Sequence, residues 1–297
     1  MAVTGRVLIL AVSARADASV PPAEALLRLV PPDATVVLTV EGLRNQVHAL
    51  STSRLVSDLR RLPVVQSWLD SDKYRRFQRS CREIEAVLGV QLTAVRDELL
   101  GDAVVLVLRL SPEAPTDPSQ ARGLLVLQAR DRALLGRLID AVNTTQRDHG
   151  ELARIVERDR AGVSYQVREF PAGTGRLPEY YVHFVDGTFA FSNSESLIQS
   201  VIDRKGRSPA VRAGSGGGGG TTAAGDVGTP RDPGLGDRPR FQAVRRRLPA
   251  RALARLFIDP RPIEHYLAAA PEPRKPTDPR IVPVLQRYVS AVDYAGA

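Results

Sequence analysis

Tyr-Tyr-Val-His-Phe-Val-Asp-Gly-Thr-Phe-Ala-Phe-Ser-Asn-Ser-Glu-Ser-Leu-Ile, residues 180–198, is the stretch that says most about the fold. Two runs rich in aromatic and β-branched residues flank Asp186-Gly187, a dipeptide typical of a type I′ turn with both central residues at positive φ. Side chains alternate between the two faces of a strand. The stretch therefore predicts a tight hairpin, which we expect in the centre of a sheet. The expected faces are Tyr180, Val182 and Phe184 opposite Tyr181, His183 and Val185, then Phe189 and Phe191 opposite Thr188, Ala190 and Ser192.

A helix should follow this hairpin directly. Asn193 or Ser194 can cap its N-terminus, and Gly206 suits the left-handed position after its last turn. Strand, turn, strand and capped helix together indicate an α+β fold, with a mixed, largely antiparallel sheet and helices packed on it. The apolar stripe expected to face the sheet is Leu197, Ile198, Val201 and Ile202.

Length and charge set broad limits on the protein. At 297 residues, two domains are the expectation, because a single core rarely grows beyond about 250 residues. The net charge is +8, and 38 of the 41 basic residues are arginine. A nucleic-acid-binding protein can have this composition, but acidic residues are interspersed and no run of five basic residues occurs. A GC-rich coding bias explains the arginines more simply, and nucleic acid is not an expected partner.

Residues 1–18 have the pattern of a signal peptide. Arg6 gives a weak positive region, residues 7–14 form a short apolar region, and Ala16-Asp17-Ala18 fits a small-x-small cleavage site. The alternative is an ordinary first strand. The apolar run is far too short to span a bilayer. We expect a secreted, periplasmic or cell-envelope protein without a transmembrane segment, whose mature chain begins at Ser19.

The rest of the chain divides by composition into three parts. Residues 19–207 mix strand and helix patterns and should form an α+β domain. Residues 208–238 include five consecutive glycines and scattered prolines, which is typical of a disordered linker. A phosphate-binding loop would need Gly-Lys-Ser/Thr after the glycines, and none is present. Residues 239–297 should form a partial second α+β unit.

Apolar runs predict the remaining strands of the first domain. Residues 35–40 are nearly all apolar or β-branched, so we expect this strand to be buried on both faces. The other expected strands cover residues 103–110, 123–129, 155–158 and 163–170.

A long helical excursion separates the first two strands. Helices should begin at Leu43, after Ser53, at Pro63 and at Lys73, and Gly89 should end the last one. Arginines recur at 60, 61, 75, 76, 79 and 82, but acidic residues dilute them, so a solvated face with ion pairs is the first expectation. Cys81, the only cysteine, lies on an apolar stripe and should be a buried thiol.

The start of the predicted second unit repeats a pattern of the first. Val30-Pro31-x-x-Ala34 precedes a strand that ends in Glu41, and Leu248-Pro249-x-x-Ala252 precedes a strand that ends in Asp259. Helical patterns follow in both places. Chance similarity of a short motif is the alternative to duplication. A strand over residues 252–258 lacks partners of its own, so we expect it to add to an open edge of the first sheet; the alternative is that the segment stays partly unfolded.

Several motifs resemble those of a domain-of-unknown-function family of exported proteins from planctomycete-type bacteria. They are the run from Pro32 to Leu43, Ser53-Arg-Leu-Val, Leu62-Pro-Val-Val-Gln-Ser-Trp, Leu99-Leu-Gly-Asp-Ala-Val-Val-Leu and Asp186-Gly-Thr-Phe-Ala-Phe-Ser-Asn-Ser-Glu. The resemblance covers residues 30–207 and part of 239–297, and members are generally longer, so the chain looks like a truncated N-terminal part. It implies an α+β fold and a cell-envelope location, and it brings no catalytic residues.

No residue pattern indicates a reaction. The histidines at 48, 149, 183 and 265 lack a second ligand at metal-binding spacing, and no Gly-x-Ser-x-Gly motif occurs. We therefore assign no catalytic, cofactor-binding or metal-ligating residue and expect no cofactor. The leading hypothesis is a noncatalytic binding or structural role in the cell envelope, with other envelope proteins as partners. The alternatives are a hydrolase that uses Ser192 or Ser194 with His183, and a binder of anionic polymers that uses the arginines of residues 54–82.

Overall fold

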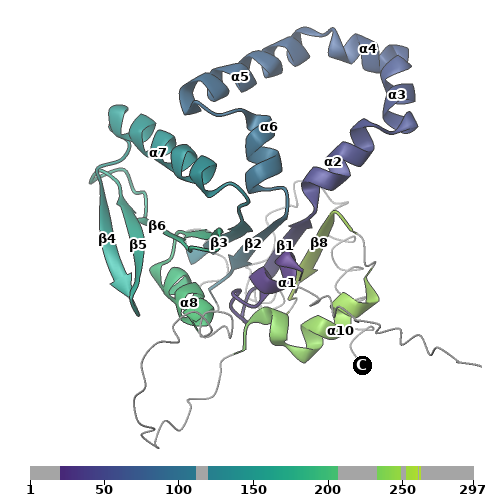
Figure 1. The fold of residues 1–297 in the computed structure, drawn as a ribbon. Coiled ribbons are helices and arrows are strands. Elements are labelled where there is room, and N and C mark those ends of the chain that lie inside the picture. The colour runs from purple at the N-terminus through teal and green to yellow at the C-terminus, as the bar shows by residue number, and fades with distance from the viewer. Residues whose placement is uncertain (1–20, 112–119, 207–232, 249–251, 260, 262–297) are drawn as a thin grey trace, which may run out of the picture.

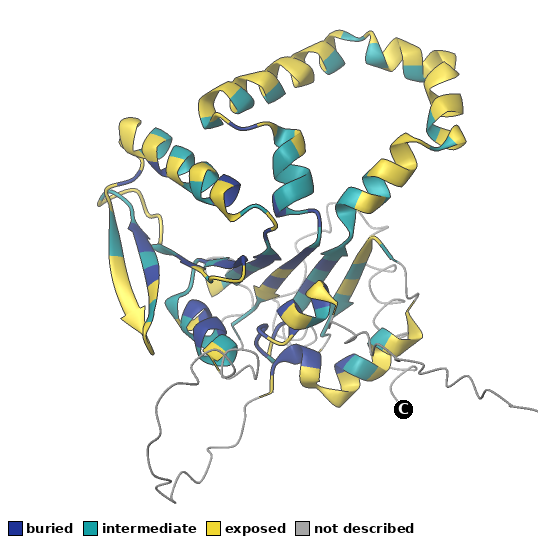
Figure 2. Ribbon diagram, in the orientation of Figure 1, coloured by how far each residue is buried: buried dark blue, intermediate teal, exposed yellow. Residues whose placement is uncertain are grey.

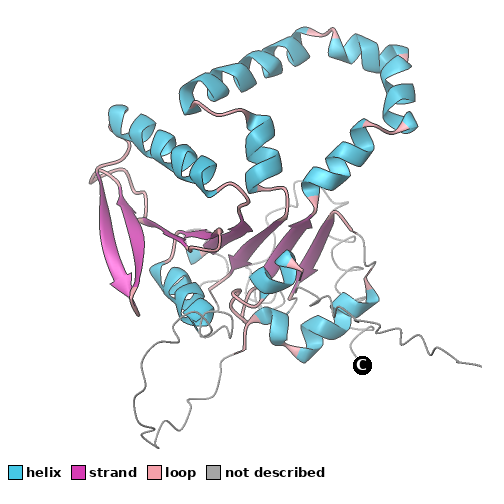
Figure 3. Ribbon diagram, in the orientation of Figure 1, coloured by secondary structure: helices cyan, strands magenta, loops and turns pink. Residues whose placement is uncertain are grey.

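The computed structural model describes residues 21–111, 120–206, 233–248, 252–259 and 261. The described strands form one eight-stranded sheet in the order β4-β5-β6-β7-β3-β2-β1-β8, and all neighbouring strands are antiparallel. With the helices around it, this sheet confirms the predicted α+β fold (Figure 3). The strands are β1 (Val36–Glu41), β2 (Ala103–Arg109), β3 (Arg122–Gln128), β4 (Arg154–Arg160), β5 (Val163–Glu169), β6 (Glu179–His183), β7 (Thr188–Ser192) and β8 (Ala254–Ile258).

Helices cover the two faces of the sheet unequally. One face, called the α8 face, packs against α1 (Pro22–Leu27), α8 (Glu195–Gly206), the 3₁₀ turn η3 (Leu235–Asp237) and α10 (Pro239–Arg247). The other, called the α7 face, packs against α7 (Arg132–Asp148) and the π-helical turn η1 (Val95–Leu99). Between β1 and β2 lie α2 (Leu43–Ser51), α3 (Arg54–Arg61), α4 (Pro63–Leu69), α5 (Asp72–Leu88) and α6 (Leu92–Ala94). Figure 2 shows most buried residues in the sheet and in the helices next to it.

The β6–β7 hairpin lies near the middle of the sheet, as its alternating side chains predict. Tyr180, Val182 and Phe184 lie with the core of the α8 face, while Tyr181 and Phe189 belong to the core of the α7 face. The following helix α8 also matches the prediction, because its predicted apolar stripe is buried.

The two candidate caps of α8 have different roles. The Ser194 carbonyl oxygen accepts the first backbone hydrogen bonds of the helix. The Asn193 side chain instead accepts from the Gly123 backbone N–H at 2.8 Å and donates to the Ala121 carbonyl at 3.2 Å, which ties α8 to the start of β3. The Asn193 side chain therefore holds the start of α8 in place relative to β3.

The predicted type I′ turn at Asp186-Gly187 is wrong. Only Gly187 has a positive φ there, at 87°, and its N–H donates to the Phe184 carbonyl at 3.0 Å. The loop thus has three residues, a turn followed by a left-handed glycine. The type I′ pattern occurs instead between β4 and β5, where Ala161 and Gly162 have φ of 53° and 75°.

Strand β1 is also less buried than predicted. Val37 and Thr39 are buried on the α8 face, but Val36, Leu38 and Val40 on the α7 face are only half-buried. The reason is that α7 and η1 pack mainly against β3, β6 and β7, which leaves the other end of the α7 face without a helix among the described residues. The nearly all-apolar sequence of β1 predicts burial on both faces. Burial on the α7 face would need a helix packed over β1, and the described helices do not supply one.

The described part of the predicted second unit belongs to the first sheet. Strand β8 pairs with β1, and an Arg255–Glu41 ion pair of 2.5 Å joins them. This agrees with the expected addition of this strand to an open sheet edge. The end of the predicted linker of residues 208–238 packs on the first domain, because Leu235 is buried and its N–H donates to the Val30 carbonyl. The predicted signal peptide of residues 1–18 lies outside the described residues, and so do positions 208–232 and 262–297.

The Gly187 turn gives a test of the hairpin geometry. A Cβ on Gly187 would lie 2.5 Å from the Ala129 carbonyl oxygen, whereas a Cβ on Gly162 would meet nothing within 4 Å. Both glycines have positive φ, so Gly162→Ala should lose about 1 kcal/mol of unfolding free energy from backbone strain alone. Gly187→Ala should lose at least about 1 kcal/mol more. Urea denaturation measures both losses, and equal losses would contradict the close approach to Ala129.

The docking of α10 gives a second test. Phe241 is 8% exposed, and its ring meets that of Phe257 of β8 edge to face at 5.1 Å. Phe241→Ala should lower the free energy of unfolding by about 3 kcal/mol, because it leaves a cavity in the α8 face. Val244→Ala is the matched control on the same helix, since Val244 is 47% exposed, and should change stability by less than about 1 kcal/mol. Similar small effects of both substitutions would show that α10 is not docked.

Candidate binding surface

The helices α2 to α5, residues 43–88, form an arch that extends away from the sheet, and we call them the helical arm (Figure 1). Local sequence explains its segments. The Ser53 hydroxyl accepts from the Val56 N–H, the Ser71 hydroxyl accepts from the Tyr74 N–H, and Pro63 occupies the first turn of α4. No residue of these four helices is buried.

Polar contacts fix the base of the helical arm to the sheet. The Arg44 guanidinium at the start of α2 donates to the Asp97 carbonyl at 2.8 Å and to the Asp102 carboxylate at 2.7 Å. Leu99 in η1 is buried, and the Glu85 carboxylate accepts from the Leu92 N–H at 2.9 Å. These contacts connect the outgoing and returning ends of the arm, so the sheet determines where it is held.

The helical arm exposes large apolar side chains. Trp68 and Phe77 are 56% and 62% exposed, and both rings pack on Tyr74, with centroid distances of 4.8 and 6.5 Å. Cys81 is half-buried, so the predicted buried thiol is wrong, because no residue of α5 is fully covered. Exposed apolar side chains in such number are typical of surfaces that contact a partner or a membrane. The other exposed apolar residues of the arm are Leu50, Leu55, Leu59, Leu62, Val64, Ile84 and Val87.

Basic residues accompany this apolar surface. Residues 43–88 contain nine arginines and lysines and five aspartates and glutamates. Two arginines form ion pairs within the arm, Arg61 with Asp58 at 4.0 Å and Arg75 with Asp72 at 2.9 Å. The structure records no acidic partner, within the part of the chain it describes, for Arg54, Arg60, Arg79 and Arg82. The predicted solvated face with ion pairs therefore describes only part of the arm.

A row of apolar side chains crosses the α7 face and reaches the sheet edge near the arm. The strand registers place these residues side by side: Tyr181, Phe191, Leu125, Leu106, Leu38 and Leu256, called the apolar row. The Tyr181 end is buried below α7, whereas Leu106 and Leu256 are 45% and 56% exposed. The exposed end adds a second uncovered apolar surface to that of the arm.

The structure does not bring Ser192 or Ser194 together with His183, the residues of the alternative hydrolase hypothesis. Ser192 is buried with its side chain on the α8 face, where its hydroxyl donates to the Gly123 carbonyl at 2.6 Å. His183 projects from the α7 face at the other end of the hairpin, paired in register with Phe189. His183 is exposed, but ring packing against Tyr181 and Phe189 removes part of its hydration, and this desolvation lowers the pKa of His183. Ser194 contacts Ser196 at 3.0 Å and no histidine that the structure describes.

Glu195, next to these serines, is part of a structural network. Its carboxylate accepts from the Tyr165 hydroxyl at 2.5 Å and from Arg158 at 2.6 Å. Burial raises the pKa of Glu195, but these two hydrogen bonds outweigh it and hold the pKa below its usual range. A carboxylate held in its charged form between β4, β5 and α8 serves to attach the helix to the sheet.

Three further observations complete the site. Within the described ranges, no group of three or more His, Cys, Asp or Glu residues could hold a metal ion. Among the helices that can be described, none is both long and apolar enough to cross a membrane. No family model, curated protein or solved structure matches this chain. The resemblance to an exported bacterial family therefore stays an expectation, and the role of the arm has to be inferred from its own residues.

Proposed function

We propose that this chain is a noncatalytic, envelope-associated binding protein whose helical arm lies on an anionic lipid surface. The observation that carries the proposal is that α2 to α5 contain no buried residue, although Trp, Phe and Leu side chains recur along them. A helix with one apolar face and one basic face is stable at the boundary between lipid headgroups and acyl chains. The arm supplies both faces and holds them away from the sheet (Figure 1).

Charge favours a lipid surface over a second copy of the chain. Two arms in contact would oppose two sets of excess positive charge, whereas anionic headgroups attract them. The predicted signal peptide and the family resemblance both favour the cell envelope as the location, where such surfaces exist. The same charge also favours the second candidate, an anionic polymer bound by the arginines of residues 54–82. The two candidates differ in their use of Trp68 and Phe77, because a polymer that binds by charge alone does not need apolar burial.

Vesicle binding tests the proposed function. Wild-type protein should sediment with vesicles of phosphatidylglycerol and phosphatidylcholine and much less with phosphatidylcholine alone. The double variant Trp68→Ser/Phe77→Ser should bind at least about tenfold more weakly, since a fully buried aromatic side chain contributes roughly 1.5–3 kcal/mol. Val185→Ser is the matched control, because Val185 is 90% exposed on a hairpin loop outside the arm. It should bind like the wild type.

A charge variant separates lipid from polymer. Arg60→Gln/Arg79→Gln should weaken vesicle binding by about 2 kcal/mol in total, at roughly 1 kcal/mol for each basic residue near an anionic surface. The anionic-polymer candidate predicts a different result. The Trp68→Ser/Phe77→Ser variant would then bind vesicles and heparin as well as the wild type does, and only the arginine variant would lose binding. Wild-type protein that stays in the supernatant with anionic vesicles at low salt would contradict the lipid proposal.

A further inference from the structure

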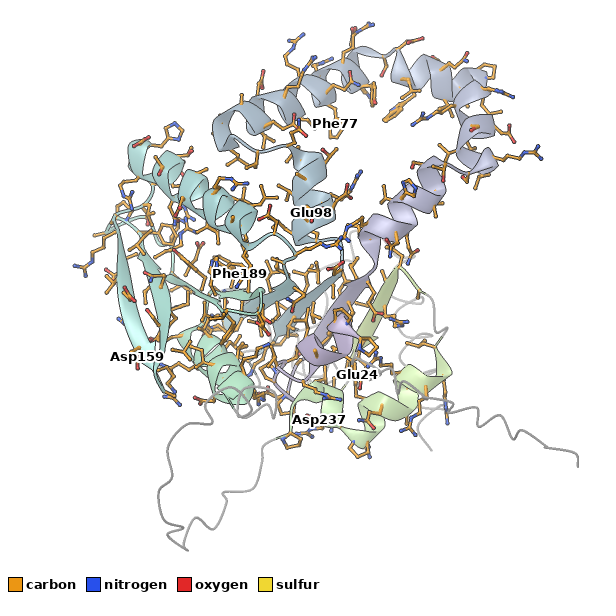
Figure 4. All side chains as sticks on the ribbon, in the orientation of Figure 1. Glu24, Phe77, Glu98, Asp159, Phe189 and Asp237 are labelled. Carbon is orange, nitrogen blue, oxygen red and sulfur yellow. The ribbon has the colours of Figure 1, made fainter. Side chains whose placement is uncertain are left out.

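A cavity of about 240 Å³ lies between α7, η1 and the α7 face of the sheet, and we call it the pocket under α7. Figure 4 shows Phe189, one of its lining residues, between α7 and the sheet. A cavity of roughly 150 Å³ lined by leucine, isoleucine and phenylalanine stays dry and binds benzene. In the same proportion, the pocket under α7 has room for about ten carbon atoms.

The lining of this pocket is apolar almost throughout. Its two polar members, Asn143 and Arg168, direct their hydrogen bonds to protein groups. The Asn143 side-chain nitrogen donates to the Tyr181 hydroxyl at 3.4 Å, and Arg168 donates to Glu179 and to Gln146. The remaining atoms, Asn143 Oδ1 and Arg168 Nε, are buried by protein atoms. A polar group drawn into the pocket would therefore lose its hydration without gaining a hydrogen bond.

The pocket extends across several strands of the sheet. Lining residues come from four adjacent strands: Arg168 of β5, Tyr181 of β6, Phe191 of β7 and Leu125 of β3. Three strand spacings give this span a length of roughly 14 Å. A space for about ten carbon atoms spread over that length is narrow, so its shape fits a chain better than a compact ring system.

One end of the pocket continues into the apolar row. Leu125 and Phe191 line the pocket, belong to the row and are both half-buried. The next member of the row, Leu106, pairs in register with Leu125 and is 45% exposed. The opposite end lies at the buried side chains of Asn143 and Arg168. A chain in the pocket can therefore reach solvent past Leu125 while it stays in contact with apolar surface.

An empty apolar pocket also has an energetic consequence. The atoms that line a void lack van der Waals partners on one side, and the loss of stability grows with the volume of the void. A ligand that fills the pocket with carbon atoms restores these contacts, and binding to the folded state alone raises the stability of that state.

We propose that the pocket under α7 binds one unbranched alkyl chain of a single-chain amphiphile such as a fatty acid, with the head group outside at the Leu106 end. The apolar lining excludes the head group, the narrow shape selects a chain, and the volume holds only one. A two-chain lipid fits less well, because its second chain would stay outside the pocket. The lining residues lie outside the helical arm, so this inference does not rest on lipid binding by the arm.

Titration calorimetry on the whole 297-residue chain tests the proposal without vesicles. Decanoate should bind with one molecule per chain and a negative heat-capacity change from apolar burial. Affinity should fall about fourfold for each CH₂ removed, from decanoate through octanoate to hexanoate. 1-Adamantanecarboxylate, which holds a similar number of carbons in a cage, should bind at least about tenfold more weakly, because the cage overfills a narrow space.

A cationic probe tests the position of the head group. Decyltrimethylammonium has the same chain length as decanoate and the opposite charge. In about 0.15 M salt, which screens exposed charges beyond roughly 8 Å, its affinity should lie within about threefold of that of decanoate. Binding of decanoate without binding of decyltrimethylammonium would show that the carboxylate is recognised, which contradicts a head group outside the pocket.

Variants of α7 locate the chain. Ile139→Trp should abolish decanoate binding, because Ile139 lines the pocket and the larger ring would fill it. Ala133→Trp is the matched control, since Ala133 lies on the same helix, is exposed and does not line the pocket, and it should leave the affinity unchanged. Unchanged binding by a folded Ile139→Trp variant would place the chain elsewhere and overturn the proposal.

The wild-type series decides the proposal even where Ile139→Trp fails to fold. Absence of saturable binding by decanoate below its micelle concentration would overturn the pocket as a ligand site. An affinity that does not change with chain length would contradict burial of the chain. Tighter binding by 1-adamantanecarboxylate than by decanoate would show that the pocket serves a compact ligand, which also contradicts the proposal.

Discussion

Burial of the α8 face is the interaction on which the rest of the structure depends. Helices α1, α8 and α10 come from three distant parts of the chain and share one core with the central strands. This core holds β1 and β8 at the sheet edge, although the other face of those strands has no helix over it within the described ranges. Because burial of the α8 face stabilises the sheet, apolar side chains on the α7 face can stay exposed.

The proposed function follows from this asymmetry. The base of the helical arm is fixed by Arg44 and by the buried Leu99, so the arm can keep its apolar side chains exposed without loss of the core. The cavity under α7 has the same origin, because the helix rests on β3, β6 and β7 without filling the space above them. The proposed binding surfaces are places where the packing of one face of the sheet is incomplete.

Local patterns predicted much of the fold. The alternation around Tyr180 and the stripe of α8 depend only on neighbouring residues, so strand faces and helix orientation could be read from the sequence. The addition of β8 to a sheet edge could also be predicted, because a lone apolar strand needs a partner. The turn at Gly187 could not, since its three-residue loop is set by strand register and by the approach of Ala129.

Burial was the main point that the sequence left undetermined. An apolar stripe looks the same whether it faces a core or solvent, so the exposure of Phe77 and Leu256 and the half-buried state of Cys81 required the tertiary structure. The pocket under α7 was equally hidden, because its lining comes from residues far apart in the sequence, from Val95 to Phe191. Trp68, the only tryptophan, allows the most direct test of the central claim. Its emission should shift to shorter wavelength and be quenched by phosphatidylglycerol vesicles with brominated acyl chains; unchanged emission with full access to aqueous iodide would contradict it.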